Sequence, residues 1–469
     1  MDSWKFDLTQ FNSVWLLVCQ LGLLLIALLF GNALRRLIPF LRKAFIPSAL
    51  LGGLILFLIN LLFDKAFGMP FIDQRIMQII TYHALAIGFI AMSLKISDVG
   101  KKKATTIKVF QNGLLTGGTY MLQAVSGLLV GLLFFWLGSG LFYDAGIILP
   151  LGFGQGPGNA LTWDLNFTEY GFDGNGSFGL TIASIGFVVA SIVGVVYINI
   201  FKSKNQIKER QVNLVRDIKD FESENEIQDS ESVDKASIQI AIVALGYGLA
   251  LAIMFFFSKL TDWTGVKLFN DVAWGFNFIW GVITATVIKL IFKYLNKKQI
   301  VHRRYINNYQ MDRISGFAFD LMIIAGVAAI DFDVITKYIW VILALSVVGG
   351  IVTYLYVRLI TKRFFKGIEH EAFLVNFGTL TGTASNGMIL LREIDPNYET
   401  PTSSIFVLSQ FPAMIGVAPL LLLLPFGASS PTNCYISLGI FGLLFIVYTG
   451  LIIFLGKREK KIKETAKVE

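Results

Sequence analysis

Cysteine and charge are both scarce in this chain. Only two cysteines, Cys19 and Cys434, occur in 469 residues, and each lies in or beside an apolar segment. Two such cysteines cannot form a disulfide framework or a cysteine-based metal site. Charged residues make up 15% of the chain, against about 25% in soluble domains. This composition excludes an ordinary soluble protein.

Several motifs that would indicate an enzyme or an ATP-driven pump are also missing. The glycine-rich stretches lack the Lys-Ser/Thr that completes a P-loop. The sequence contains no zinc motif and no nucleophile elbow. The segment Met1–Asn12 carries both charge signs and no basic leader, which predicts that no signal peptide is cleaved.

Apolar residues dominate the chain: 55% are hydrophobic and 14% are aromatic. A bilayer span needs about 20 apolar residues, so the sequence predicts an all-α, polytopic membrane protein. The formal net charge of +8 does not indicate nucleic-acid binding, because the basic residues lie in loops beside apolar segments. The expected spans are 13–33, 46–63, 76–96, 106–137, 177–201, 238–258, 271–292, 314–331, 334–360, 402–425 and 434–456.

The chain divides into two similar halves around a charged stretch. Each half has five spans, and each has a segment that is apolar at its ends and polar in the middle, which predicts a re-entrant hairpin. The expected parts are a first repeat at 1–201 with a hairpin at 142–166, a charged cytoplasmic linker at 202–237, a second repeat at 238–425 with a hairpin at 370–394, and an additional transmembrane helix with a basic tail at 426–469.

The basic loops predict the orientation, because cytoplasmic loops carry an excess of Lys and Arg. With the N-terminus outside and the C-terminus cytoplasmic, only a few basic residues remain outside. These are Lys5, Lys65, Arg75, Lys259, Lys267 and Lys337. An odd number of spans per half makes the second half start on the opposite side. The two halves are therefore expected to be inverted repeats whose hairpin tips meet near the middle of the membrane.

The two polar segments are rich in helix-breaking residues. The first runs Gly152-Phe-Gly-Gln-Gly-Pro-Gly-Asn-Ala160, and the second runs Gly378-Thr-Leu-Thr-Gly-Thr-Ala-Ser-Asn-Gly387. Small residues also let membrane helices pack closely, but packing alone does not require so many amide and hydroxyl groups together. Broken backbone at membrane depth offers carbonyl oxygens to a cation and N–H groups to a carboxylate.

Candidate site residues follow from these segments. Arg392 could bind a carboxylate in a bidentate manner, although an arginine at the cytoplasmic end of the hairpin, beside Glu393 and Asp395, is the favoured interpretation. Asp320 either takes part in an ion site or is solvated near the end of its span. The predicted substrate-binding residues are Gly154, Gln155, Gly156, Gly158, Asn159, Thr381, Gly382, Thr383, Ser385, Asn386 and Arg392; the predicted sodium site lies near Gly152, Asn159, Thr379, Ser385 and Asp320.

These residues resemble the bacterial sodium/glutamate symporter family over roughly residues 10–425. The similar stretches are Ile46-Pro-Ser-Ala-Leu-Leu-Gly-Gly53, the first glycine-rich segment with Glu169-Tyr-Gly-Phe172, and Gly378–Asn386. The first segment differs from the family's common Gly-Gly-His-Gly-Thr-Gly, since Gln155 stands at the His position and Pro157 at the Thr position. The second also differs, with Asn386 beyond its Gly-Thr-Ala-Ser.

The resemblance implies a secondary transporter of the bacterial inner membrane, with an inverted-repeat fold, a homodimer and elevator-type alternating access. It implies sodium-coupled uptake of L-glutamate or a related acidic amino acid, with sodium as the coupling ion and no other cofactor. The alternatives that stay open are sodium- or proton-coupled transport of another small organic anion or amino acid, a channel and a membrane enzyme.

Overall fold

The computed structural model describes residues 13–95, 106–204, 206–207, 235–265, 268–300, 305–396 and 400–465. Most of the predicted linker 202–237, the segment Met1–Asn12, and the basic residues Lys101–Lys103, Arg303, Arg304 and Lys467 lie outside this description. Helices and turns make up the described residues, and no β-strand occurs among them. The expected all-α class is confirmed.

Ten helices in the described ranges are long and apolar enough to cross a membrane. Their bounds are α1 (Ser13–Leu37), α3 (Ser48–Phe67), α4 (Gln74–Leu94), α5 (Thr106–Trp136), α8 (Ser177–Ser203), α9 (Lys235–Thr264), α11 (Asn277–Lys297), α13 (Phe332–Phe364), α16 (Thr402–Ala428) and α17 (Pro431–Thr465).

Two of the expected spans differ from this set. The expected span 314–331 is α12 (Asn308–Ala328), which is not among the ten because Asp312, Arg313 and Asp320 interrupt its apolar sequence. The expected span 271–292 is divided between α10 (Leu268–Gly275) and α11, since Phe276 has a non-helical backbone. The short helix α2 (Pro39–Lys43) follows α1.

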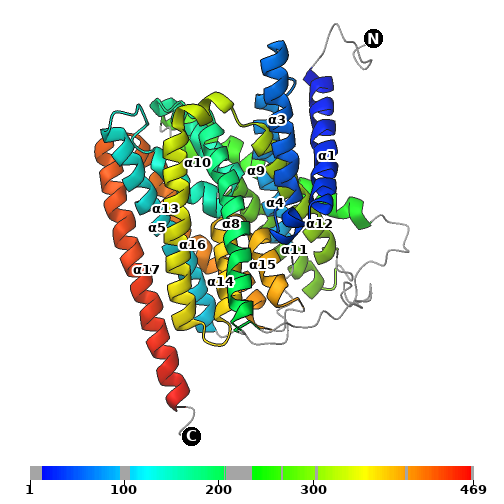
Figure 1. Cartoon of the computed structure of the whole chain (residues 1–469). Helices are drawn as coiled ribbons and strands as arrows, with labels where there is room; N and C mark the ends of the chain where they lie inside the picture. The colour runs from blue at the N-terminus through cyan, green and yellow to red at the C-terminus, as the bar shows by residue number, and fades with distance from the viewer. Residues whose placement is uncertain are drawn as a thin grey trace.

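One group of helices surrounds α5. This helix packs against α13, α16 and α17, and α17 forms one edge of the bundle (Figure 1). Close approach to α16 depends on glycines. A Cβ atom added to Gly113 would lie 2.8 Å from Pro412, and one added to Gly117 would lie 3.2 Å from Gly416, so neither position has room for a side chain without a shift of its neighbour. Apolar burial between such helices cannot drive their association in lipid, so this close van der Waals packing stabilises the group.

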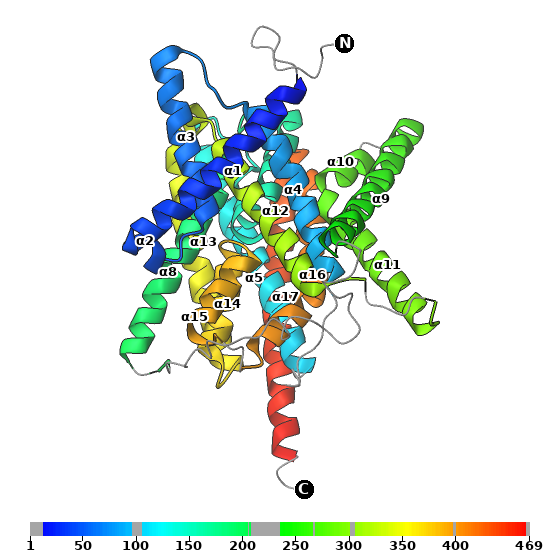
Figure 2. The ribbon, with the colours of Figure 1, turned by 90° about the vertical axis from the view of Figure 1, so that its right-hand side faces the viewer.

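A second group is built around α4 and α12, which pack along each other. The pair α1 and α3 lies on one side of them, and α9, α10 and α11 lie on the other (Figure 2). Glycines again allow the contacts: a Cβ on Gly88 of α4 would lie 2.6 Å from the Phe319 ring of α12, and one on Gly53 of α3 would lie 2.6 Å from Val327.

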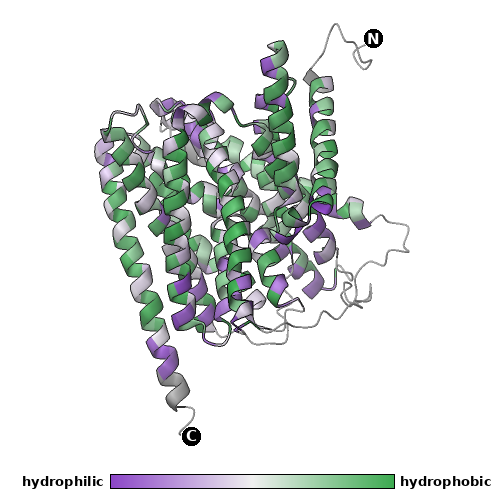
Figure 3. Ribbon diagram, in the orientation of Figure 1, coloured by the Kyte–Doolittle hydropathy of each residue, from purple (hydrophilic) through white to green (hydrophobic). Residues whose placement is uncertain are grey.

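The helices are apolar along most of their length, and hydrophilic residues gather near the end of the bundle where α17 ends (Figure 3). We call this the lower end, and the end where α1 begins the upper end. Ion pairing at the lower end joins Lys108 at the start of α5 to Glu459 near the end of α17, at 2.6 Å. At the upper end, the Trp136 indole N–H donates to the Tyr435 hydroxyl at 3.2 Å.

Candidate functional site

A broken helical segment lies between α5 and α8. It comprises η1 (Ala145–Ile147), α6 (Ile148–Pro150), the π-helical turn η2 (Leu151–Gln155) and α7 (Pro157–Asn166). Gly156 separates η2 from α7 with φ +83° and ψ −173°, a conformation that only glycine adopts readily. Pro157 then starts α7 at a position where its missing N–H costs nothing. The sequence therefore produces the break locally.

A second broken segment lies between α13 and α16. It consists of α14 (Glu369–Leu380), the residues Thr381–Thr383 and α15 (Ala384–Ile394). Thr383 is extended, with φ −140° and ψ 167°. The helices α14 and α15 pack against each other at a glycine pair, since a Cβ on Gly378 would lie 2.8 Å from the Gly387 Cα.

The two broken segments are anchored at opposite ends of the bundle. Both ends of the first segment lie at the upper end, and both ends of the second lie at the lower end. At the upper end, Tyr143 donates to the Ala428 carbonyl before the first segment, and Asp173 pairs with Lys337 after it. At the lower end, His370 bonds to Tyr197 at 2.9 Å, and Glu393 lies 3.7 Å from Lys202, both on the last turns of α8. Each segment thus leaves and returns to its own end of the bundle.

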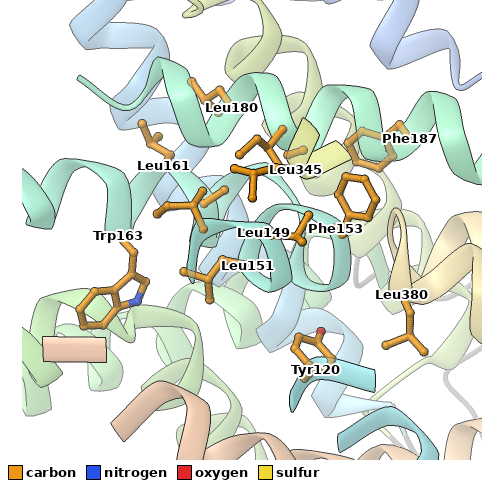
Figure 4. Packing of buried hydrophobic residues seen from close by; sticks show 14 of the residues in the cluster. Tyr120, Leu149, Leu151, Phe153, Leu161, Trp163, Leu180, Phe187, Leu345 and Leu380 are labelled. Carbon is orange, nitrogen blue, oxygen red and sulfur yellow. The ribbon is translucent and has the colours of Figure 1, made fainter. Parts of the chain in front are cut away.

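The two breaks are in contact. A Cβ on Gly156 would lie 3.4 Å from Thr383 Cγ2, 3.9 Å from the Gly382 carbonyl oxygen and 3.9 Å from Met322 Cε of α12. The first segment is packed into the apolar core, since its side chains Phe153 and Leu161 share one buried cluster with Leu180 of α8 (Figure 4). The backbone groups that the two breaks leave outside a helix therefore face the same buried region.

Polar side chains at this meeting point are buried without hydrogen-bond partners. Both amide atoms of Asn159 lack a partner, although the residue is only 1% exposed. Gln155 Oε1 and Asn386 Nδ2 are likewise buried and unpartnered. Buried polar groups are otherwise almost always hydrogen-bonded, so these atoms are available to bond to a ligand.

The sodium/glutamate symporter family model matches residues 16–385. This is most of the chain, and it includes both breaks and ends in the first turn of α15. The chain belongs to the sodium/glutamate symporter family. No individual curated protein matches it significantly. Family membership identifies a symporter-type transporter and not an enzyme, as expected from the sequence; the match ends earlier than the expected resemblance to residue 425.

Three glycines of the symporter's first segment are packing residues. A Cβ on Gly152 would lie 2.9 Å from Ile182, one on Gly154 would lie 2.6 Å from the Tyr120 ring, and one on Gly158 would lie 2.9 Å from Leu85. The packing interpretation thus accounts for these positions, whereas Gly156 forms the break itself.

The threonines of the second segment differ in what they bind. Thr379 and Thr381 each donate their hydroxyl to the carbonyl one turn earlier, at 2.7 Å, so their oxygens can still accept or coordinate. The Thr383 hydroxyl lies 3.5 Å from Asn386 Oδ1. The Thr383 side chain therefore contacts the first break at Gly156, and Asn386 lies beside Thr383.

Three predicted site residues of the symporter do not face the buried region between the breaks. Ser385 and Arg392 are exposed on α15, and Arg392 is near the lower end of that helix. Met322 is the residue through which α12 reaches the break. Asp320 points about 200° away from Met322 around the helix axis, so it faces away from Gly156.

Sequence reasoning did not single out Asp164, a buried carboxylate on α7. Its Oδ2 accepts the Gly179 N–H at 2.9 Å and so ties α7 to the first turn of α8. A carboxylate within an apolar segment of a membrane protein is unusual enough to have identified it. Asp164 positions the helix that carries Asn159.

A polar stripe on α5 links several helices. Asn112 donates to Ser409 at 2.7 Å and accepts from Asn376 at 2.8 Å. Gln123 donates to Thr353 and to the Leu380 carbonyl, both at 2.8 Å. The last bond reaches the residue just before the second break. This stripe holds α14 in place and connects it to α5, α13 and α16.

Proposed function

We propose that this symporter couples an inward sodium gradient to the uptake of L-glutamate or a related acidic amino acid. The observation that carries the proposal is the contact between Gly156 and Thr383, around which Gln155, Asn159 and Asn386 have buried polar atoms without partners. A site assembled from both breaks can bind a substrate and an ion together.

The chemistry of the two breaks suits both ligands. The first turns of α7 and α15 start at the breaks, so their free N–H groups and partial positive charge favour a carboxylate. The Asn159 and Asn386 amides can donate to the same carboxylates. Carbonyl oxygens left free at the breaks, including that of Gly382, can replace the water around sodium. Sodium is the only cofactor this scheme needs.

Inverted repeats are supported by paired contacts across the two halves. Helix α4 packs on α11 while α12 packs on α3, and α5 packs on α16 while α13 packs on α8. The broken segments return to opposite ends of the bundle, which supports re-entrant hairpins of opposite orientation. We further propose that the lower end is cytoplasmic in a bacterial inner membrane, because Arg358, Lys362 and the basic end of α17 lie there.

Alternating access of the elevator type would move one helix group past the other. The group around α5 holds both broken segments, whereas α4 and α12 contact them mainly through α7. If the helices around α4 and α12 form the interface of a homodimer, the dimer keeps that group fixed while the group around α5 moves. Light scattering of the purified protein tests the dimer, since a monomeric mass would contradict it.

Transport of another small organic anion or amino acid is the alternative, with sodium or protons as the coupling ion. Gln155 supports this alternative, because it places an amide with an unpartnered oxygen where the family commonly has an imidazole. Competition by a panel of amino acids and dicarboxylates would show which ligand the site prefers.

Uptake of labelled L-glutamate into proteoliposomes tests the proposal. We expect saturable accumulation that requires an inward sodium gradient and is lost in Asn159→Ala and Asn386→Ala. Ser385→Ala is the matched control, because Ser385 is exposed on the same turn of α15 as Asn386. Accumulation without sodium, or of a different anion only, would contradict the assignment. Loss of uptake in Ser385→Ala as well would contradict the location of the site.

A further inference from the structure

A large cleft opens at the lower end of the bundle, separate from the two breaks. Its volume is about 610 Å³, and it lies between the ends of α8 and α13 and the start of α14. Its lining residues are Phe201, Gln206, Arg358, Lys362, Glu369 and His370. His370 precedes Thr381 by about three turns of α14, or about 16 Å, so the cleft cannot be part of the site at the breaks.

The guanidinium of Arg358 is held in place by aromatic rings. It stacks over Tyr197 at 5.3 Å and Phe201 at 4.9 Å from the ring centroids. Tyr197 is itself fixed by a hydrogen bond of 2.9 Å between its hydroxyl and His370 Nδ1. Arg358 Nη1 is nevertheless buried without a hydrogen-bond partner. A rigid cation with an unused donor beside an open cleft is suited to bind an anion.

The charges in the cleft match those of an acidic amino acid. Lys362 follows Arg358 by one turn of α13 and adds a second cation to the lining. Glu369 is the acidic residue among the described residues of the lining, and its Oε2 accepts the Gly367 N–H at 2.6 Å. Two cations and one carboxylate complement a ligand that carries two carboxylates and one ammonium group.

We propose that this cleft is a second, weaker binding site for the acidic amino acid that the symporter carries. Arg358 and Lys362 bind its two carboxylates, and Glu369 binds its ammonium group. The site lies on the release side in the orientation proposed above, and it holds the substrate after it leaves the breaks. This inference rests on the proposed function, because it assigns the same substrate to both sites.

Calorimetric titration of the full-length protein with L-glutamate in saturating sodium tests the inference. We expect two classes of site. Arg358→Gln and Lys362→Gln should weaken the weaker class at least tenfold and leave the tighter class unchanged, whereas Asn159→Ala should abolish only the tighter class. Lys366→Gln is the control, since this exposed lysine lies four residues after Lys362, beyond the end of α13, and is not among the lining residues.

Ligand analogues separate this amino-acid site from a general anion site. Glutarate has both carboxylates but no ammonium group, so it should bind the cleft more weakly than L-glutamate. Glu369→Gln should remove that preference. Equal or tighter binding of glutarate or inorganic phosphate in the wild type would overturn the inference and indicate a general oxyanion site, such as one for lipid phosphate.

Other outcomes distinguish this inference from the proposed function. A single class of L-glutamate sites that Asn159→Ala abolishes would overturn the cleft site and leave the proposed function standing. Binding that only the cleft variants abolish would contradict the proposed site at the breaks. Arg358 also packs on aromatic rings, so its variant is interpreted only together with Lys362→Gln. If the affinity of the weaker class of sites is unchanged in Lys362→Gln, the inference is overturned.

Discussion

Gly156 and Thr383, which are far apart in sequence, face each other across the two helix breaks, with 3.4 Å between the position of a Cβ on Gly156 and Thr383 Cγ2. Gly156 has φ +83° and ψ −173°. This backbone conformation explains why glycine stands at the point where the two segments meet, whereas the distance to Thr383 is an ordinary van der Waals contact.

Gly156→Ala should therefore abolish sodium-dependent uptake while the protein still inserts in the membrane. The new side chain costs about 1–3 kcal/mol in this backbone conformation, so the break cannot keep its geometry without strain. Gly248→Ala is the control, because no atom lies within 4 Å of its added Cβ on α9. Normal uptake by Gly156→Ala would show that the contact between the breaks is not needed for transport.

Sodium and substrate should raise each other's affinity by the same factor, because both would bind at the same pair of breaks. The measurement is substrate affinity at several sodium concentrations, paired with sodium affinity at several substrate concentrations. Asn159→Ala should reduce this coupling, since its buried amide lies in the first turn of α7, which starts at the first break. Substrate binding that does not depend on sodium would contradict coupling at this site.

Asp164→Ala should destabilise the region around α7. The substitution leaves the buried Gly179 N–H without its acceptor, which costs about 1–3 kcal/mol. A lower melting temperature in detergent, together with weaker substrate binding, is the expected result. Asp262→Ala provides the control, because the Asp262 side chain is 68% exposed; an equal loss in both variants would argue against a positioning role for Asp164.

The stability of the upper end should fall as the pH rises from acidic values. Burial raises the pKa of Asp144, in the loop before η1, well above its ordinary value. The folded protein then retains a proton that the unfolded chain has already released, so stability decreases with increasing pH above the ordinary pKa of an aspartate. Asp144 lies beside Gly427 and Ser437 at the junction of α16 and α17.

Melting temperatures measured across this pH range check the expectation. Asp144→Asn should show a smaller decrease than the wild type, since it cannot ionise. Asp262→Asn should behave like the wild type. An identical pH dependence in Asp144→Asn and the wild type would show that another group controls the stability of this region.

Much of this architecture could be predicted from sequence because it depends on local chemistry. Apolar runs define helices such as α5 and α13, since backbone groups in lipid must be satisfied within the helix. Glycine at 156 followed by Pro157 produces a break whatever surrounds it. The charged residues of α12 and the division at Phe276 were less predictable, because packing against α4 and α9 determines how those segments are accommodated.

Only the tertiary structure decided which polar residues lie together. The sequence placed Gln155, Asn159, Ser385, Asn386, Arg392 and Asp320 in one candidate set. The structure buries Asn159 and Asn386 in the first turns of the two helices that start at the breaks, whereas Ser385 and Arg392 are exposed and Asp320 faces away. Residue type and spacing by themselves determined that this chain spans a membrane and breaks its helices twice. Which side of each helix faces the other break depends on the packing of segments more than 200 residues apart, and that packing brings Gly156 to Thr383.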